Sequence, residues 1–198
     1  MTQLTQSRPA GGAANPVARH QAAALQARQT AADAPQQYLT FLLGGEMFAV
    51  GILNVKEIIE YGNLTEIPMM PPFIRGVINL RGSVVPVIDL AARFGHAQSQ
   101  VGKRTCIVIV EVTENDLRHD IGIMVDAVSE VLEIPGSDIE PPPSFGARIR
   151  ADFIFGMGNV GGKFVILLSI NRVLSVEEIA QLTATEAVAD ATAMPTAS

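Results

Sequence analysis

The stretch "FIRGVINLRGSVVPVIDL", from Phe73 to Leu90, decides the fold because the chain repeats it eighty positions later as "FIFGMGNVGGKFVILLSI". Both copies are rich in β-branched residues and carry glycine at the same places, which is typical of two short strands joined by a tight turn. Four recurring glycines are predicted to occupy turn and bulge positions in the two copies. They are Gly76, Gly82, Gly156 and Gly162.

A second pair of segments extends the repeat toward the N-terminus. "FAVGILNVKEI" (Phe48 to Ile58) matches "IGIMVDAVSEV" (Ile121 to Val131) at a spacing of 73, so the second copy carries seven extra residues. Two matching blocks in the same order indicate internal duplication. We predict an all-β fold of two five-stranded β-barrel subdomains, SH3-like or OB-like, with a few short helices. Each is too small to bury a sufficient core alone, so they should dock around a shared groove.

Composition divides the chain into three parts. Residues 1–36 are rich in Ala, Gln, Gly and Pro and are predicted to be a disordered tail, as are residues 183–198. Residues 37–182 form the folded unit, with one subdomain over about 37–101 and the other over about 102–182. Helical signal in this unit is limited to "ILNVKEII" and to "SVEEIAQL", which Ser175 could cap.

Charge and cysteine content restrict the function. The formal net charge is −6, which argues against nucleic-acid binding, and the single Cys106 excludes an intramolecular disulfide. The N-terminus does not resemble a secretory signal, and 18 apolar residues never run uninterrupted, so we expect a cytoplasmic protein without direct membrane insertion.

Enzymatic readings find little support in the sequence. "GMGNVGG" has dinucleotide-binding spacing, but a strand follows it where that motif requires a helix. The histidines lack a partnered nucleophile, and the aspartates are too dispersed to suggest a metal site. We therefore expect no catalysis, cofactor, metal or small-molecule ligand. An OB-like oligonucleotide-binding barrel remains an alternative, although the chain has no Trp and only two Tyr for base stacking.

Differences between the copies indicate where their roles diverge. Arg75 is replaced by Phe155 and Arg81 by Gly161 in the second copy, so the fold itself does not need these two cations. An exposed arginine is usually just a solvated charge. A guanidinium beside an apolar β-rich patch is also well suited to recognising carboxylate or backbone oxygens.

These segments resemble the CheW family, the adaptors of bacterial chemotaxis that join membrane chemoreceptors to the histidine kinase CheA. The resemblance rests on "YLTFLLGGEMFAV", "ILNVKEII", "RGVINLRGSVVPVIDL", "IGIMVDAVSEVLEI" and "GMGNVGGKFVILLSINRVL", and covers about residues 37–182. Two positions depart from the family pattern. Gly51 stands where an acidic residue or proline is common, and Ser169 stands where an aspartate is common.

The resemblance implies partners and sites. Arg81, Val55 and Glu57 would bind the cytoplasmic tip of the receptor coiled coil, and Ile52 and Ile58 would complete an apolar strip. The spacing alone leaves open whether the three aliphatic residues form a groove or belong to the core.

A second surface implied by the resemblance would bind the regulatory barrel domain of CheA, with Phe73 and Arg75 as candidates. The protein would be a non-enzymatic scaffold that is cytoplasmic and associated with membrane receptor arrays. The alternative within this class is an adaptor of a different receptor–kinase array, such as one for surface motility.

Overall fold

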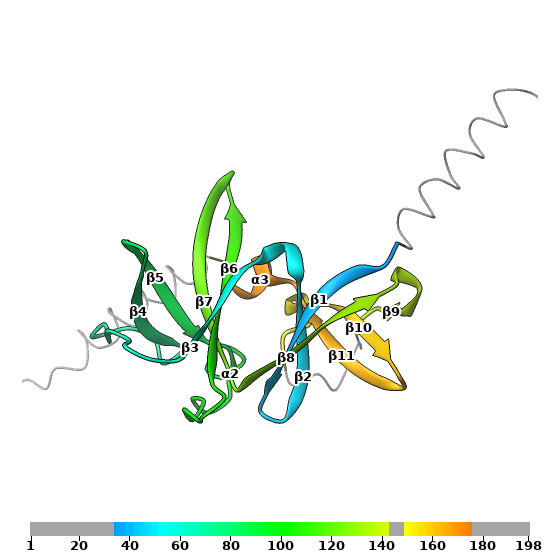
Figure 1. The fold of residues 1–198 in the computed structure, drawn as a ribbon, viewed down its shortest axis with the longest axis horizontal. Helices are drawn as coiled ribbons and strands as arrows, with labels where there is room; N and C mark the ends of the chain where they lie inside the picture. The colour runs from blue at the N-terminus through cyan, green and yellow to red at the C-terminus, as the bar shows by residue number, and fades with distance from the viewer. Residues whose placement is uncertain (1–33, 143–148, 176–198) are drawn as a thin grey trace, which may run out of the picture. The chain divides into compact units, whose positions relative to one another are not determined.

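The computed structural model describes residues 34–142 and 149–175, and the described residues from Pro35 onward belong to one compact unit. The fold is mainly β, as predicted, with two sheets and a few short helices (Figure 1). None of the helices in the described ranges is long and apolar enough to cross a membrane.

The first sheet has five strands in the order β3-β6-β7-β5-β4, and all neighbours are antiparallel except β5 and β7. Its strands are β3 (Val55–Glu60), β4 (Ile74–Leu80), β5 (Ser83–Asp89), β6 (Cys106–Glu114) and β7 (Leu117–Val125). The loop after β3 returns to the opposite edge, where Thr65 bridges Val77 of β4. This pairing connects the two edges of the sheet, so the sheet curls into a barrel-like shape.

The second sheet has six strands in the order β8-β1-β2-β11-β10-β9, with β2 and β11 parallel. Its strands are β1 (Gln36–Leu43), β2 (Glu46–Gly51), β8 (Ala127–Ile134), β9 (Ile139–Glu140), β10 (Ile154–Val160) and β11 (Lys163–Leu168). The helical turn η2 (Gly136–Asp138) links β8 at one edge to β9 at the other. The second sheet thus curls in the same way as the first.

The two sheets exchange hairpins, which corrects the expected division of the strands near residue 101. Hairpin β1–β2 belongs to the second sheet, and hairpin β6–β7 belongs to the first. The 3-10 helix η1 (Ile52–Asn54) carries the chain from β2 across to β3, and Asp126 separates β7 from β8 in the same way. Each sheet therefore combines strands from both repeats, a pairing that similarity between the copies cannot reveal.

The register confirms the duplication. In β4–β5, Ile74 pairs with Ile88 across a bulge that ends at Gly76, and the residues eighty positions later pair identically in β10–β11. Each hairpin turn is also closed by the same contact. The Asn79 side chain accepts a hydrogen bond from the Gly82 N–H at 2.9 Å, as that of Asn159 does from Gly162 at 3.2 Å.

Gly76 and Gly156 lie at these bulges because the chain opposite passes too close for a side chain. A Cβ at Gly76 would overlap the Thr65 carbonyl, and a Cβ at Gly156 would lie 2.5 Å from the Ile139 Cγ2. Gly82 and Gly162 hold the second turn positions with φ of +90° and +80°. Both pairs of glycines therefore occupy the kinds of position predicted for them.

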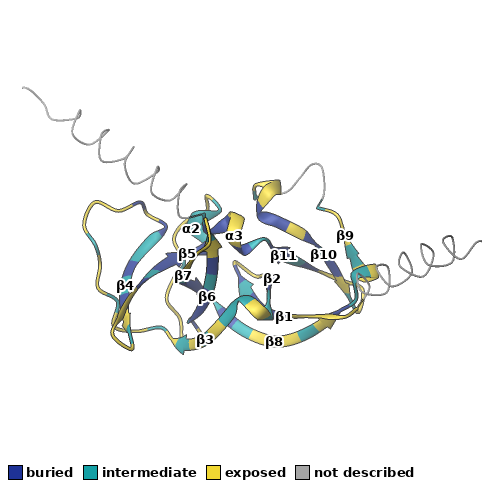
Figure 2. Ribbon diagram, turned by 90° about the horizontal axis from the view of Figure 1, so that it is seen from above, coloured by how far each residue is buried: buried dark blue, intermediate teal, exposed yellow. Residues whose placement is uncertain are grey.

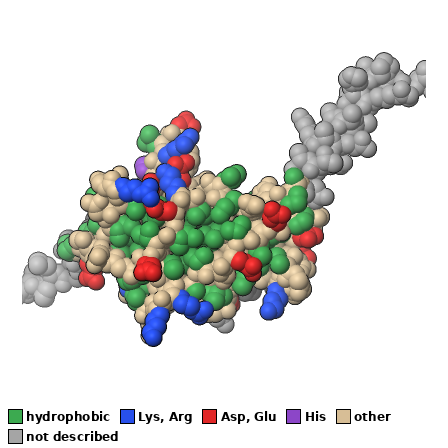
Figure 3. Space-filling view, viewed as in Figure 1, with side chains coloured by type: hydrophobic (Ala, Val, Ile, Leu, Met, Phe, Trp, Pro, Cys, Tyr) green, Lys and Arg blue, Asp and Glu red, His purple; other side chains and the backbone are tan. Residues whose placement is uncertain are grey.

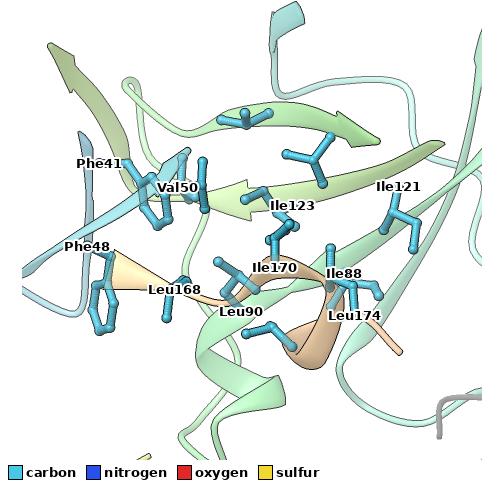
Figure 4. Close-up of a cluster of buried hydrophobic side chains, with 14 of the residues drawn as sticks. Phe41, Phe48, Val50, Ile88, Leu90, Ile121, Ile123, Leu168, Ile170 and Leu174 are labelled. Carbon is cyan, nitrogen blue, oxygen red and sulfur yellow. The ribbon is translucent and has the colours of Figure 1, made fainter. Parts of the chain in front are cut away.

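Three apolar clusters form the core, and the largest lies between the outer faces of the two sheets. Figure 4 shows part of this shared cluster, to which β1, β2, β5, β7 and the chain after β11 contribute. Two short helices seal it: α2 (Leu90–Arg93) after β5 and α3 (Ile170–Val173) after β11. Burying this cluster docks the two sheets, in line with the small size of each.

The expectation of a helix over "ILNVKEII" was wrong beyond its first three residues. Val55–Glu60 is strand β3, and its side chains alternate between half-buried and exposed, the period of a strand with one covered face. The segment "SVEEIAQL" lies outside the described residues except for Ser175.

Candidate functional site

An apolar face runs along the 3-10 helix η1 and along β3 and β8, which are edge strands of the two sheets. These elements lie on the face toward the viewer in Figure 1 and along the lower edge of Figure 2. Figure 3 shows hydrophobic side chains gathered across the middle of this face. We call it the edge-strand face. Its aliphatic residues that are exposed or half-buried are Ile52, Leu53, Val55, Ile58, Val128 and Val131.

The predicted aliphatic residues divide into two kinds. Ile52 and Val55 are half-buried and pack against the shared core, so they support the face from below. Ile58 is 44% exposed and is free to contact a partner. Sequence reasoning missed Leu53, which is 97% exposed at the centre of η1. The helical interpretation of this segment hid it, because only the true turn shows that Leu53 points away from the core.

Arg81 and Glu57 form an ion pair. The Arg81 Nη2 lies 2.9 Å from the Glu57 Oε2, and the Arg81 side chain is 80% exposed against 27% for Glu57. Arg81 lies in the turn that follows β4, whereas Glu57 lies on β3. The ion pair therefore joins the two edges of the first sheet. The carboxylate orients the guanidinium and leaves most of its donors facing solvent.

The backbone of Arg81 is strained. Its φ is +51°, a left-handed conformation that disfavours residues with a Cβ, and Gly161 holds the same position in the second sheet with φ of +57°. Glycine would be the more stable choice at both turns. The first turn keeps an arginine there despite the strain, which is the pattern found at functional positions.

A network of charges continues from this pair. Lys56 lies at a bulge in β3, and its Nζ contacts the Glu111 Oε2 at 2.9 Å and the Asp120 Oδ1 at 2.6 Å. These hydrogen bonds, above all that to Asp120, raise the pKa of the Lys56 ammonium above its ordinary value. A small pocket of about 290 Å³ lies among Lys56, Glu57, Leu80, Arg81, Ser83 and Asp120.

The two candidates for the kinase surface lie in different environments. Phe73 is only 9% exposed and belongs to the shared core, so its assignment to a docking surface is corrected. The guanidinium carbon of Arg93 lies 5.4 Å from its ring centroid and 4.9 Å from that of Phe153, the equivalent residue of the second copy. Phe73 therefore helps hold the repeats together.

Arg75 is half-buried at the β4–β5 bulge. Its Nη1 donates to the Gln98 Oε1 at 3.1 Å, and the Gln98 side chain donates to the Pro72 carbonyl at 2.7 Å. At the equivalent position Phe155 is 58% exposed. Arg75 thus remains a surface candidate, fixed in place by the loop after α2.

Other features bear on the enzymatic alternatives. "GMGNVGG" forms β10 and the turn into β11, so the helix that a dinucleotide site requires is replaced by a strand. No group of three or more metal-ligating side chains is assembled within the described ranges. A cavity of about 930 Å³ lies between the β1–β2 turn, β10–β11 and the loop after α2, and none of the described residues that line it is Lys or Arg.

Comparison with known proteins places this architecture in a family. The model of the CheW-like domain matches residues 37–178. The chemotaxis protein CheW of Klebsiella aerogenes is 37% identical over 145 residues, which cover 73% of this chain and 85% of that protein. The protein FrzA of Myxococcus xanthus is 33% identical over 141 residues, covering 70% and 85%.

A solved structure agrees in fold. The crystal structure of the scaffolding protein TtCheW from Thermoanaerobacter tengcongensis aligns with a TM-score of 0.64 at 36% identity, covering 71% of this chain and 88% of that chain. The family match extends over all the strands described above except the first residue of β1. The chain therefore belongs to the CheW family of chemotaxis scaffold proteins.

Proposed function

We propose that the protein couples chemoreceptors to the histidine kinase CheA at membrane receptor arrays, with the edge-strand face and Arg81 as its receptor-binding site. The proposal rests mainly on the conformation and environment of Arg81. It keeps a strained backbone where the duplicate turn has glycine, it is held by Glu57, and it is highly exposed beside an apolar face. A residue with no role in the fold and a fixed orientation is suited to recognition.

The edge-strand face suits an amphipathic helix. Leu53, Ile58 and Val131 expose aliphatic surface on rigid elements, and Ile52 and Val55 back them from the core. Such a face can receive the apolar stripe of a helix, while a charge at its rim fixes direction and register. The cytoplasmic tip of a chemoreceptor, a helical hairpin, is the partner that we assign to it.

The kinase would bind elsewhere on the first sheet. Arg75 lies on β4 and is held by a hydrogen bond to Gln98. The exposed Val84 lies on the neighbouring strand β5. We assign this surface to the regulatory barrel domain of CheA. Separate surfaces for the two partners are what an adaptor requires, because both must be bound at once.

The similarity to FrzA supports a second candidate within the same class. An adaptor of a different receptor–kinase array would use the same surfaces with different partners. Genes for receptors and a kinase adjacent to the gene for this chain would identify the array.

Aspartate at Leu53 or Ile58 is expected to weaken binding of a receptor tip fragment at least roughly tenfold, because a charge would be buried against the apolar stripe of the helix. Both side chains face solvent in the free protein, so the unfolding free energy should change by less than about 0.5 kcal/mol. Isothermal titration calorimetry and urea unfolding measure the two quantities.

Val101→Asp is the matched control, since Val101 is an exposed aliphatic residue in the loop before β6 and lies outside the edge-strand face. It should bind receptor like the unmodified protein. Equal weakening by all three substitutions, or by none, would remove the edge-strand face from the receptor site.

A further inference from the structure

The β6–β7 hairpin is longer than its duplicate requires. Phe41 pairs with Phe48 in β1–β2, and the equivalent Val110 pairs with Ile121 in β6–β7. Six residues lie between the first pair and ten between the second, although both hairpins end in a two-residue turn with positive φ. The added length projects at the top of Figure 1. The fold is complete without it, as β1–β2 shows.

The extension is held from both sides. On one face Lys56 clamps Glu111 and Asp120 at its base. On the other, Asn171 of α3 accepts a hydrogen bond from the Thr113 N–H at 3.3 Å, and the Ser175 hydroxyl donates to the Glu114 carboxylate at 3.0 Å. The projecting strands are therefore fixed in advance, which lowers the entropy lost when a partner binds.

Arg118 connects the extension to the candidate receptor site. Its Nη1 lies 3.5 Å from the Glu111 Oε1, and Glu111 also pairs with Lys56. Lys56 precedes Glu57 in the sequence, and Glu57 pairs with Arg81. Figure 3 shows basic and acidic side chains gathered on the projecting hairpin and at its base. The two turns, β4–β5 and β6–β7, thus border one continuous charged surface.

The cations of this surface lie outside its anions. Arg81 and Arg118 are 80% and 75% exposed, whereas the carboxylates of Glu57 and Glu111 are 27% and 25% exposed. An approaching protein therefore meets guanidinium groups first. Each has an acidic neighbour that fixes its position, and its remaining donors can take a carboxylate in a forked geometry.

We propose that Arg118, presented by the extended β6–β7 hairpin, is a second contact for the helical partner that docks at Arg81, and that it binds acidic side chains of that partner. This inference rests on the receptor site proposed above and names a specificity-determining residue within it. The formal net charge of −6 argues against a nucleic-acid partner, so among anionic partners the acidic helix is favoured.

The test uses the full chain and a tip fragment of a chemoreceptor from the same organism. Arg118→Ala should weaken binding roughly three- to tenfold and reduce its dependence on salt, because a rim charge acts through screened attraction. Deleting Thr113, Glu114, Leu117 and Arg118 removes two cross-strand pairs, keeps the Asn115–Asp116 turn and should weaken binding equally. Lys163→Ala, at the β10–β11 turn, removes one exposed positive charge elsewhere and should change nothing.

A chemical readout identifies the group that Arg118 meets. In an Arg118→Lys variant, a carbodiimide should join the new amine to a partner carboxylate, giving an adduct that mass spectrometry maps to residue 118. If Arg118→Ala and the deletion both bind like the unmodified protein while Arg81→Gly is weakened, this inference is wrong and the receptor site stands. If Arg81→Gly also binds normally, the proposed receptor site is wrong as well.

Discussion

Arg81→Glu is expected to weaken receptor association roughly a hundredfold, the largest change in binding that any single substitution should produce. The variant removes the exposed cation at the rim of the edge-strand face and places a second carboxylate beside Glu57, so an acidic partner meets repulsion instead of attraction. Surface plasmon resonance with an immobilised receptor fragment measures the dissociation constant. Kinase binding should be unchanged, because Arg75 and Val84 are untouched.

The duplicate turn supplies the control. Arg81→Gly copies Gly161, so it should weaken receptor binding roughly tenfold while stabilising the fold by up to about 1 kcal/mol through relief of the left-handed backbone. Binding and stability should therefore change in opposite directions. Loss of stability in Arg81→Gly, or a similar loss of receptor and kinase binding in Arg81→Glu, would show that Arg81 serves the fold and not recognition.

Asp89→Ala is expected to lower the free energy of unfolding by about 3 kcal/mol, because it leaves buried donors without acceptors. The Asp89 carboxylate is inaccessible to solvent. Its Oδ1 accepts from the backbone of Ala91 and Ala92 at the start of α2 and from the Ser99 hydroxyl, and its Oδ2 accepts from the Ser99 N–H at 2.7 Å. Urea unfolding followed by circular dichroism measures the loss.

Ser169 occupies the equivalent position before α3, and its side chain makes no capping hydrogen bond there. Ser169→Ala should therefore change the unfolding free energy by less than about 0.5 kcal/mol. This asymmetry gives a structural meaning to the departure from the family pattern at Ser169. If Asp89→Ala lowered the unfolding free energy no more than Ser169→Ala is expected to, the Asp89 hydrogen bonds would contribute little to stability.

Much of the fold could be predicted from the repeat. The glycines and asparagines that recur at a spacing of eighty mark the same bulges and turns in both sheets, because backbone geometry restricts those positions to few residue types. The hairpin exchange could not be predicted. Hairpins β1–β2 and β6–β7 present similar apolar faces, so their sequence pattern fits either sheet equally well.

The structure brings two of the predicted polar residues together and divides the predicted apolar residues between surface and core. Arg81 stood out in the sequence because its duplicate is glycine, and the structure shows that it pairs with Glu57. Aliphatic spacing is the same in a core and on a docking face. Leu53 was missed and Phe73 was misplaced for that reason, since only burial in the folded chain distinguishes the two.

The most direct test of the central claim is a three-component sedimentation assay with a receptor tip fragment, CheA and this protein, in which each component is omitted in turn. Receptor assembled on vesicles should carry CheA into the pellet when this protein is present, and much less without it. Arg81→Glu should abolish that recovery while the variant still binds CheA in solution. Full recovery of CheA without this protein, or with the Arg81→Glu variant in its place, would contradict the account.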